Sequence, residues 1–271
     1  MTASLRVMEI ARGIAGAVCG RLLAGLGHDV VMCEPASGDP LRRQPPLNCE
    51  GTSLAFVSLN ADKRSAILPP GGLADGLGTL FDGADVLILD LTRDEAAGLG
   101  ITPERLRASW PRLVTVWITG FGLDGELSRL PSDSLLAEAY GGLATMIGEV
   151  GRRPLGLGGE QAAYCAGVTG FLGAMLALIR RDGGLAGDIV DVALCDVAAY
   201  MDWKSDIMLH MTGAAPARQG ADAGEWRLIR AADGWVGCIF QQRHWTAFTE
   251  LVGAAELRDP QLADEATRIK A

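Results

Sequence analysis

Short, almost unbroken apolar runs alternate along most of the chain with longer segments whose apolar residues recur at helical spacing. Unbroken apolar runs are typical of strands in a parallel sheet, because both faces of such a sheet are covered. Strands are expected at residues 6–10, 29–34, 85–90, 113–119 and 188–194. Helices are expected at residues 14–26, 135–147, 161–181 and 196–211, and another helix is expected to begin at Thr102-Pro103-Glu104. This alternation predicts an α/β fold with a doubly wound parallel sheet.

The pattern changes after Gly213. The segment GAAPARQGADAG is small and irregular and predicts a linker. Beyond it, residues 226–230 and 235–240 flank an Ala-Asp-Gly turn, which predicts a β-hairpin, and a helix is expected from about 244 to 252. We therefore expect a large domain over 1–212, a linker over 213–224 and the start of a smaller domain over 225–271.

Composition and charge narrow the class of protein. The 271 residues are 49% hydrophobic and 21% charged, as in globular proteins with a substantial core. The net charge of −9, without a basic patch, disfavours a nucleic-acid partner. The longest apolar run, 168–179, is shorter than the roughly 20 residues that span a bilayer, so we expect a buried helix and no membrane partner. No secretory signal is visible, and a cytoplasmic location is expected.

Several common site motifs are absent from the sequence. The six cysteines have no CxxC spacing and the three histidines are scattered, so we expect reduced core thiols and no metal. Gly13, Gly16 and Gly20 do not have the spacing of a dinucleotide-binding turn, and packing of the helix against the sheet explains Gly16 and Gly20 more simply. The pairs Arg42-Arg43 and Lys63-Arg64 are either solvated loop charges or counter-charges for an anionic ligand.

Five stretches in a fixed order carry a family resemblance. They are RVMEIARGIAGAVCGRLLAGLGHDVVMCEPASGDPLR, LNADKRSAIL, ADVLILDLTRDEAAGLGITPERL, PRLVTVWITGFGLDG and GGLAGDIVDVALCDVAAYM. Together they resemble the family III CoA-transferases, the carnitine dehydratase and bile-acid-inducible group, from about Leu5 to Phe240. The resemblance implies a Rossmann-like large domain, a connecting helix, a smaller domain and an interlocked dimer. It also implies a C-terminal return segment, which we expect this chain to lack.

The resemblance also implies a catalytic position. In family members, an Asp at the start of a helix with the motif D-x-x-x-G forms an aspartyl-CoA intermediate. When this motif is aligned with QAAYCAGVTG, Ala163 takes the position of that Asp. Standard aspartyl-CoA transfer is therefore not expected. Glu160, almost one turn upstream, is a candidate replacement; Cys165 is either another nucleophile or a packed core residue. Asp133, where the racemase branch has a His, is either an acid–base group or a helix cap.

The CoA-binding positions that the resemblance implies are mostly in the first half of the chain. They are Arg12, Ala15, Gly16, Arg42, Lys63 and Arg64, with Asp90 and Leu91 replacing the family's Asn-Phe pair. Basic side chains suit the phosphates of CoA, whereas an aspartate beside a phosphate is unfavourable unless it is neutralised. In addition, Gly98 stands where the family has a later basic residue.

Two classes of function remain open from the sequence. One is an atypical acyl-CoA enzyme, such as a lyase, isomerase or non-standard transferase, with CoA or acyl-CoA as its substrate, no metal, and Asp133 and Glu160 as catalytic residues. The other is a non-catalytic subunit of a hetero-oligomeric CoA-transferase, or a protein that only binds the ligand. The expected partners are a small acyl substrate and, in a homodimer or heterodimer, a homologous chain.

Overall fold

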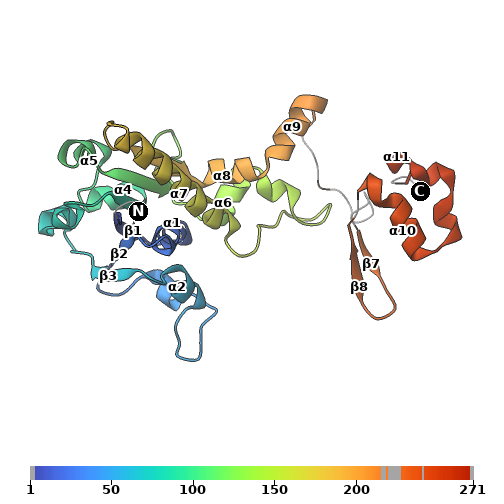
Figure 1. Cartoon of the computed structure of the whole chain (residues 1–271), viewed down its shortest axis with the longest axis horizontal. Coiled ribbons are helices and arrows are strands. Elements are labelled where there is room, and N and C mark those ends of the chain that lie inside the picture. The colour runs from blue at the N-terminus through green and yellow to red at the C-terminus, as the bar shows by residue number, and fades with distance from the viewer. Residues whose placement is uncertain (1–3, 215–217, 219–226, 240, 269–271) are drawn as a thin grey trace. The chain divides into compact units, whose positions relative to one another are not determined.

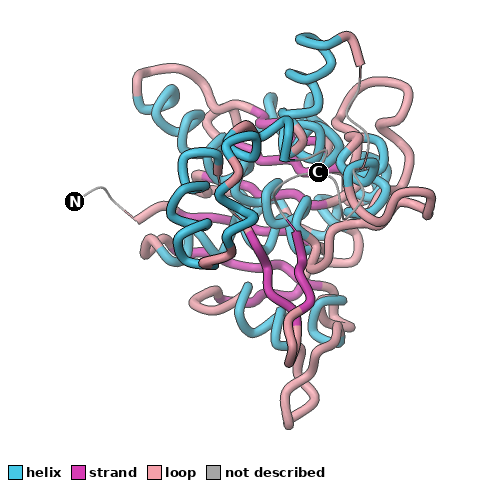
Figure 2. The backbone as a smooth tube through the Cα atoms, turned by 90° about the vertical axis from the view of Figure 1, so that its right-hand side faces the viewer, coloured by secondary structure: helices cyan, strands magenta, loops and turns pink. Residues whose placement is uncertain are grey.

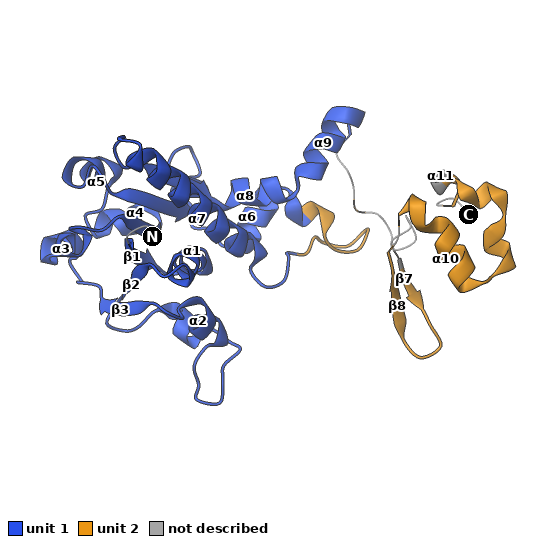
Figure 3. Cartoon of the chain, viewed as in Figure 1, with its two compact units in different colours: residues 1–144, 156–214 blue, residues 145–155, 215–271 orange. Residues whose placement is uncertain are grey.

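The computed structural model describes residues 4–214, 218, 227–239 and 241–268. The chain divides into two compact units, residues 1–144 with 156–214 and residues 145–155 with 215–271 (Figure 3). Most of the predicted linker at 213–224 lies outside the described residues.

The first unit is built on a six-stranded parallel sheet in the order β3-β2-β1-β4-β5-β6 (Figure 1). The strands are β1 (Arg6–Ala11), β2 (Asp29–Glu34), β3 (Arg64–Ile67), β4 (Val86–Asp90), β5 (Val114–Thr119) and β6 (Ile189–Ala193). The chain builds outward from β1 in one direction and from β4 in the other, so the strand order reverses between them. The predicted α/β fold with a parallel sheet is confirmed.

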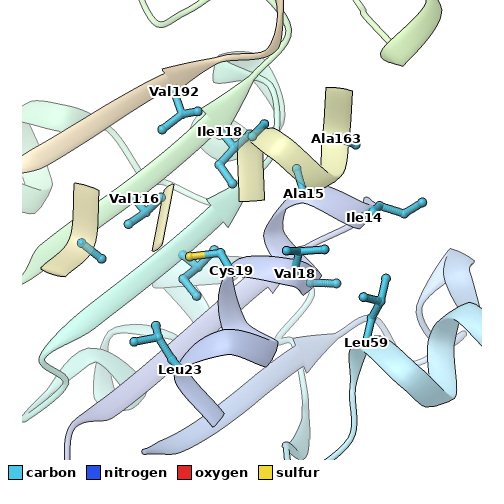
Figure 4. Close-up of a cluster of buried hydrophobic side chains, with 14 of the residues drawn as sticks. Ile14, Ala15, Val18, Cys19, Leu23, Leu59, Val116, Ile118, Ala163 and Val192 are labelled. Atoms are coloured by element: carbon cyan, nitrogen blue, oxygen red, sulfur yellow. The ribbon is translucent and has the colours of Figure 1, made fainter. Parts of the chain in front are cut away.

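Helices cover both faces of this sheet (Figure 2). The helices of this unit are α1 (Ile14–Gly25), α2 (Leu54–Leu59), α3 (Gly78–Phe81), α4 (Arg93–Gly98), α5 (Pro103–Ser109), α6 (Ser134–Tyr140), α7 (Gln161–Asp182), α8 (Leu194–Met201) and α9 (Trp203–Thr212), of which α9 has no buried residue. One core joins α1 and α7 to strand residues such as Val116 (Figure 4). The other core joins α3, α4 and α5 to the alternate strand residues, among them Trp117.

Small residues let α7 approach its neighbours closely. A Cβ added to Gly167 would lie 2.5 Å from the carbonyl oxygen of Ala15 in α1, and one added to Gly173 would lie 2.5 Å from Val190 in β6. Only one face of α7 is buried, because Leu172 and Leu176 are exposed. Among the described residues, α7 alone has the length and apolarity of a membrane span, a test that core helices of soluble proteins also pass.

Some elements differ from the predictions. The helix expected over 135–147 ends at Tyr140, because Gly142 has a left-handed φ of 88°. Gly141 before it lies against α8, where an added Cβ would be 2.7 Å from the carbonyl oxygen of Cys195. The helix expected over 196–211 is divided into α8 and α9 at Asp202. The edge strand β3 was not predicted, since its mostly exposed residues form no apolar run.

The second unit contains the predicted hairpin. Strands β7 (Arg227–Arg230) and β8 (Trp235–Cys238) pair antiparallel, and the amide of Ala231 donates to the carbonyl oxygen of Gly234. Helices α10 (Trp245–Val252) and α11 (Glu265–Arg268) follow. Residues 226 and 240, the outer ends of the predicted hairpin, lie outside the described residues.

A buried ion pair joins the start of the sheet to α1. The Nζ atom of Lys63 lies 3.0 and 2.8 Å from the two carboxylate oxygens of Glu9, and both side chains are only 1% exposed. Lys63 also donates to the carbonyl oxygen of Ala17 and to the Oδ1 of Asn60, each at 2.9 Å. Gly20 leaves room for the carboxylate, because a Cβ there would lie 1.7 Å from Glu9 Oε2.

Loss of one partner of this pair is expected to destabilise the first unit strongly. Burial already raises the pKa of Glu9 to about 7, and Lys63→Met leaves this buried carboxyl without its partner. Loss of one partner of a buried pair costs about 3–5 kcal/mol of unfolding free energy. Urea titration at neutral pH measures the loss. The double variant Glu9→Gln/Lys63→Met is expected to recover part of it; equal or greater destabilisation in the double variant would contradict this account.

Candidate active site

A cavity of about 300 Å³ opens at the carboxyl ends of the central strands. Its wall comes from the loop after β1 and the start of α1, the 3-10 turn Pro40–Arg43, the end of β4, and the starts of α6 and α7. A second hollow of about 220 Å³ shares Arg12, Gly13, Asp90 and Ser132 with it. The carboxyl edge where the strand order reverses is the usual ligand position in open α/β sheets.

Asp90 lies at the centre of this edge, between the two hollows. Its Oδ2 atom accepts a hydrogen bond of 3.0 Å from the amide of Gly16, in the first turn of α1. The close fit requires glycine, since a Cβ on Gly13 or on Gly16 would lie 2.8 Å from an Asp90 atom. The free amide groups at the N-terminus of a helix attract anions, and here the carboxylate of Asp90 accepts from one of them, the amide of Gly16.

The environment of Asp90 perturbs its acidity. Burial raises the pKa of Asp90 to about 6, although the hydrogen bond from Gly16 acts in the opposite direction. The nearby charge of Glu95 raises it further. A pKa in this range is favourable for a general acid or base that works near neutral pH.

Arg12 is the basic side chain at this edge. Its guanidinium forms an ion pair of 2.7 Å with Glu95, and both side chains are about two-fifths exposed, at 45% and 40%. Glu95 is fixed by a capping box, in which it accepts from the Thr92 amide while the Thr92 hydroxyl accepts from the Glu95 amide. Arg12 is therefore partly neutralised but remains accessible from the cavity.

The predicted catalytic positions meet at the same cavity. Asp133, Glu160 and Ala163 all line it. Asp133 caps α6, because its Oδ1 accepts a hydrogen bond of 2.8 Å from the amide of Leu136. Asp133 is therefore a helix cap that also lines the cavity. Glu160 precedes α7 in a left-handed conformation with φ of 59°, and Ala163 lies in the first turn of that helix.

Three predicted CoA-binding residues are engaged elsewhere. Lys63 is buried against Glu9. The Nε atom of Arg64 pairs with Asp29 at 2.9 Å, at the amino end of the sheet. Arg42 does not line the cavity, and a doubly hydrogen-bonded pair ties it to Glu34 at 2.7 and 2.6 Å. A role for these residues in CoA binding stays a prediction.

The pair between Arg42 and Glu34 supports the cavity wall. Hydrogen bonds from Arg42 lower the pKa of Glu34 to about 2, and the Arg42 guanidinium lies 4.1 Å from the centre of the Phe56 ring. The pair holds the turn from which Pro40 and Leu41 enter the cavity wall. Arg42 thus positions the Pro40–Arg43 turn, which forms part of the cavity wall.

The remaining predicted positions are at the edge itself. Ala15 lines the cavity, whereas the amide of Gly16 is committed to Asp90. Leu91 lines the smaller hollow, and its carbonyl oxygen accepts from Trp117 Nε1 at 2.9 Å. Sequence reasoning missed Glu95, although the spacing Thr92-x-x-Glu95 is the signature of the capping box that fixes it. In the described part of the chain, no group of three or more His, Cys, Asp or Glu is arranged to hold a metal ion.

Replacing Asp90 is expected to change how stability depends on pH. A carboxyl whose pKa is raised on folding contributes stability that is present below pH 4 and is lost as the pH rises through 6. Asp90→Asn stays neutral and keeps an acceptor for the Gly16 amide. Relative to wild type, we expect this variant to gain on the order of 2 kcal/mol of unfolding free energy between pH 4 and pH 7. Urea titrations across this range measure the difference; a constant difference would show that Asp90 titrates normally.

Comparisons with known proteins agree with this architecture. The model of CoA-transferase family III matches residues 3–271. The chain is 29% identical to succinyl-CoA:(R)-benzylsuccinate CoA-transferase subunit BbsE of Thauera aromatica, over 96% of this chain and 66% of that protein. It is 30% identical to succinyl-CoA:mesaconate CoA-transferase of Haloarcula marismortui, over 93% of this chain and 67% of that protein.

A solved structure gives the same result for the fold. The crystal structure of a CAIB/BAIF family protein from Brucella suis superposes with a TM-score of 0.85 at 26% identity, covering 98% of this chain and 73% of that one. The chain spans about two thirds of the length of the curated relatives that it matches. On the match of the family model to nearly its whole length, the chain belongs to CoA-transferase family III.

Proposed function

We propose that the chain acts on an acyl-CoA thioester at the carboxyl-edge cavity, by a route other than standard aspartyl-CoA transfer. The observation that carries this proposal is the gathering of Asp90, Asp133 and Glu160 around Ala163 in one cavity. Membership of CoA-transferase family III supports the acyl-CoA part of the proposal. Alanine at position 163 supports the altered route, because a methyl group cannot attack a thioester.

The three carboxylates suit proton transfer next to a thioester. The carbon beside a thioester carbonyl is acidic, so a base can remove its proton and an acid can return it, as in an isomerase or lyase. Asp133 uses only Oδ1 for its helix cap, and Glu160 is exposed at the cavity wall. The raised pKa of Asp90 fits the same kind of chemistry. We assign Asp133 and Glu160 as the catalytic pair and Asp90 as a third group at the same edge.

The charge of the cavity supports one orientation of the substrate. Arg12 is the cation of the wall and is accessible, which suits a phosphate of CoA. Asp90, Asp133 and Glu160 lie together in the remaining wall and would repel those phosphates. We therefore place the phosphates of CoA at Arg12 and the acyl group toward the carboxylates.

Removing the catalytic carboxylates is expected to lower turnover without unfolding the protein. Asp133→Asn keeps the helix cap, because asparagine caps as well as aspartate, and Glu160→Gln keeps the size of the side chain. We expect each to reduce turnover of an acyl-CoA by about 10²–10⁴-fold. Glu104→Gln, at an exposed residue of α5 away from the cavity, is the matched control.

These variants are assayed with the purified chain and a panel of CoA and acyl-CoAs, whose binding is measured first by calorimetry. Binding with unchanged turnover in both variants would show that the assignment of Asp133 and Glu160 is wrong. Absence of binding by the wild-type chain would contradict the proposed substrate class.

Restoring a carboxylate at position 163 tests the family alignment directly. Ala163→Asp is expected to form a covalent adduct when incubated with an acyl-CoA, because its carboxylate can attack the thioester. Intact-mass spectrometry with peptide mapping detects the adduct, and the wild-type chain serves as the control. Acyl-CoA binding without an adduct at residue 163 would show that this residue does not occupy the nucleophile position.

A non-catalytic subunit is the second candidate function. Two observations support it. Position 163 is an alanine, and the chain is similar to BbsE, which is named as a subunit of its transferase. In this case the chain would pair with a homologous chain that retains the aspartate, and homodimers would not turn over substrate. Turnover by the purified chain alone, lost in Asp133→Asn, would exclude it.

A further inference from the structure

A second cavity lies at the opposite edge of the sheet from the candidate active site. It has a volume of about 420 Å³ and is formed at the amino ends of β4 and β5, beside the last turn of α7. The residues that give it its chemical character are Phe81, Asp85, Ser109, Trp110, Arg112 and Arg181. None of them lines the carboxyl-edge cavity.

Arg181 is a buried cation whose hydrogen-bonding capacity is only partly used. Its side chain is 8% exposed, and Nη1 lies 3.0 Å from Asp85 Oδ1. Its buried Nε atom has no hydrogen-bond partner, lying 3.5 Å from Asp182 Oδ1 outside bonding geometry. In the described residues Nη2 also donates no hydrogen bond. A buried donor without a partner is costly, so this guanidinium is suited to a further acceptor.

The charges of the cavity wall favour an anion with a single charge. Arg112 is exposed and, within the described residues, has no ion pair or side-chain hydrogen bond. Asp85 is the carboxylate of the wall, and its Oδ2 already accepts from the backbone amide of Arg6 at 3.0 Å. Within the wall, two guanidinium groups face one carboxylate, while Asp182, which lies outside the wall, also pairs with Arg181 at 3.5 Å. The net charge of the wall residues is therefore +1, which a single carboxylate group balances.

The same wall offers a fixed aromatic surface. Trp110 packs edge-on against Phe81, with ring centres 5.2 Å apart and planes at 77°. Its Nε1 atom donates to Asp82 Oδ1 at 3.0 Å, which holds the ring in place. Trp110 is only partly buried, while Phe81 is almost fully buried beneath it. A flat apolar group can pack against such a ring without reorganising the wall.

We propose that this cavity is a binding site for a small aromatic monocarboxylate. The carboxylate pairs with the guanidinium groups of Arg112 and Arg181, and the ring packs against Trp110. Guanidinium groups match the planar geometry of a carboxylate and can hold it with paired hydrogen bonds. The site lies apart from the candidate active site and does not depend on the function proposed there.

Calorimetric titration of the full chain with benzoate tests the site. We expect benzoate to bind, and Arg112→Gln to weaken its binding at least tenfold, because this exposed residue contributes half of the positive charge without supporting the fold. Arg107→Gln is the matched control, since Arg107 is also exposed near this edge but does not line the cavity. Circular dichroism of each variant confirms that it is folded.

Chemical controls separate the charge from the ring. Benzamide, which has the ring without the charge, and inorganic phosphate, which has charge without the ring, are each expected to bind at least tenfold more weakly than benzoate. Equal binding of benzamide, or unchanged benzoate binding in Arg112→Gln, would overturn the proposal.

A variant of the other edge locates the bound acid. Arg12→Gln is expected to leave benzoate binding unchanged, since Arg12 belongs to the carboxyl-edge cavity. Loss of binding in Arg12→Gln but not in Arg112→Gln would place the acid at the candidate active site and would likewise overturn the proposal. Failure of benzoate to bind to the wild-type chain would also overturn it, while leaving the proposed acyl-CoA function untouched.

Discussion

The reversal of strand order between β1 and β4 is the constraint on which the rest of the structure depends. Because the chain leaves these neighbouring strands in opposite directions, no connection covers the edge between them. The first turn of α1 and the end of β4 meet there, and Asp90 accepts from the Gly16 amide. The starts of α6 and α7 close the remaining sides of the cavity. A single topological feature thus places side chains from distant parts of the sequence around one space.

The sequence was most informative where burial determines residue type. The apolar runs predicted the buried strands, and the helix start at Thr102-Pro103-Glu104 was predicted correctly, because both follow from local chemistry. The edge strand β3 lacks such a run and was not visible locally. The end of α6 was missed although Gly141-Gly142 marks it, because apolar residues continue beyond this pair as far as Ile147. The ion pairs of Lys63 with Glu9 and of Arg42 with Glu34 were also missed, since a basic residue in isolation does not show which acid neutralises it.

The candidate site is unusual in the balance of its charges. A cavity for CoA would be expected to be basic, yet Asp90, Asp133 and Glu160 outnumber Arg12, which is itself paired with Glu95. Such a wall disfavours acyl groups that carry a second carboxylate, in contrast to the succinyl group named for two of the relatives. The raised pKa of Asp90 has a different origin, because it comes first from burial and then from the nearby charges of Glu95 and Asp39.

Helix α7 connects the two edges of the sheet. Ala163 lies in its first turn and Arg181 in its last, and its 22 residues correspond to a length of about 33 Å. Along this length, Gly167 and Gly173 fit against α1 and β6 without space for a single additional carbon atom. The two cavities therefore lie at opposite ends of one closely packed helix, one beside its first turn at Ala163 and the other beside its last turn at Arg181.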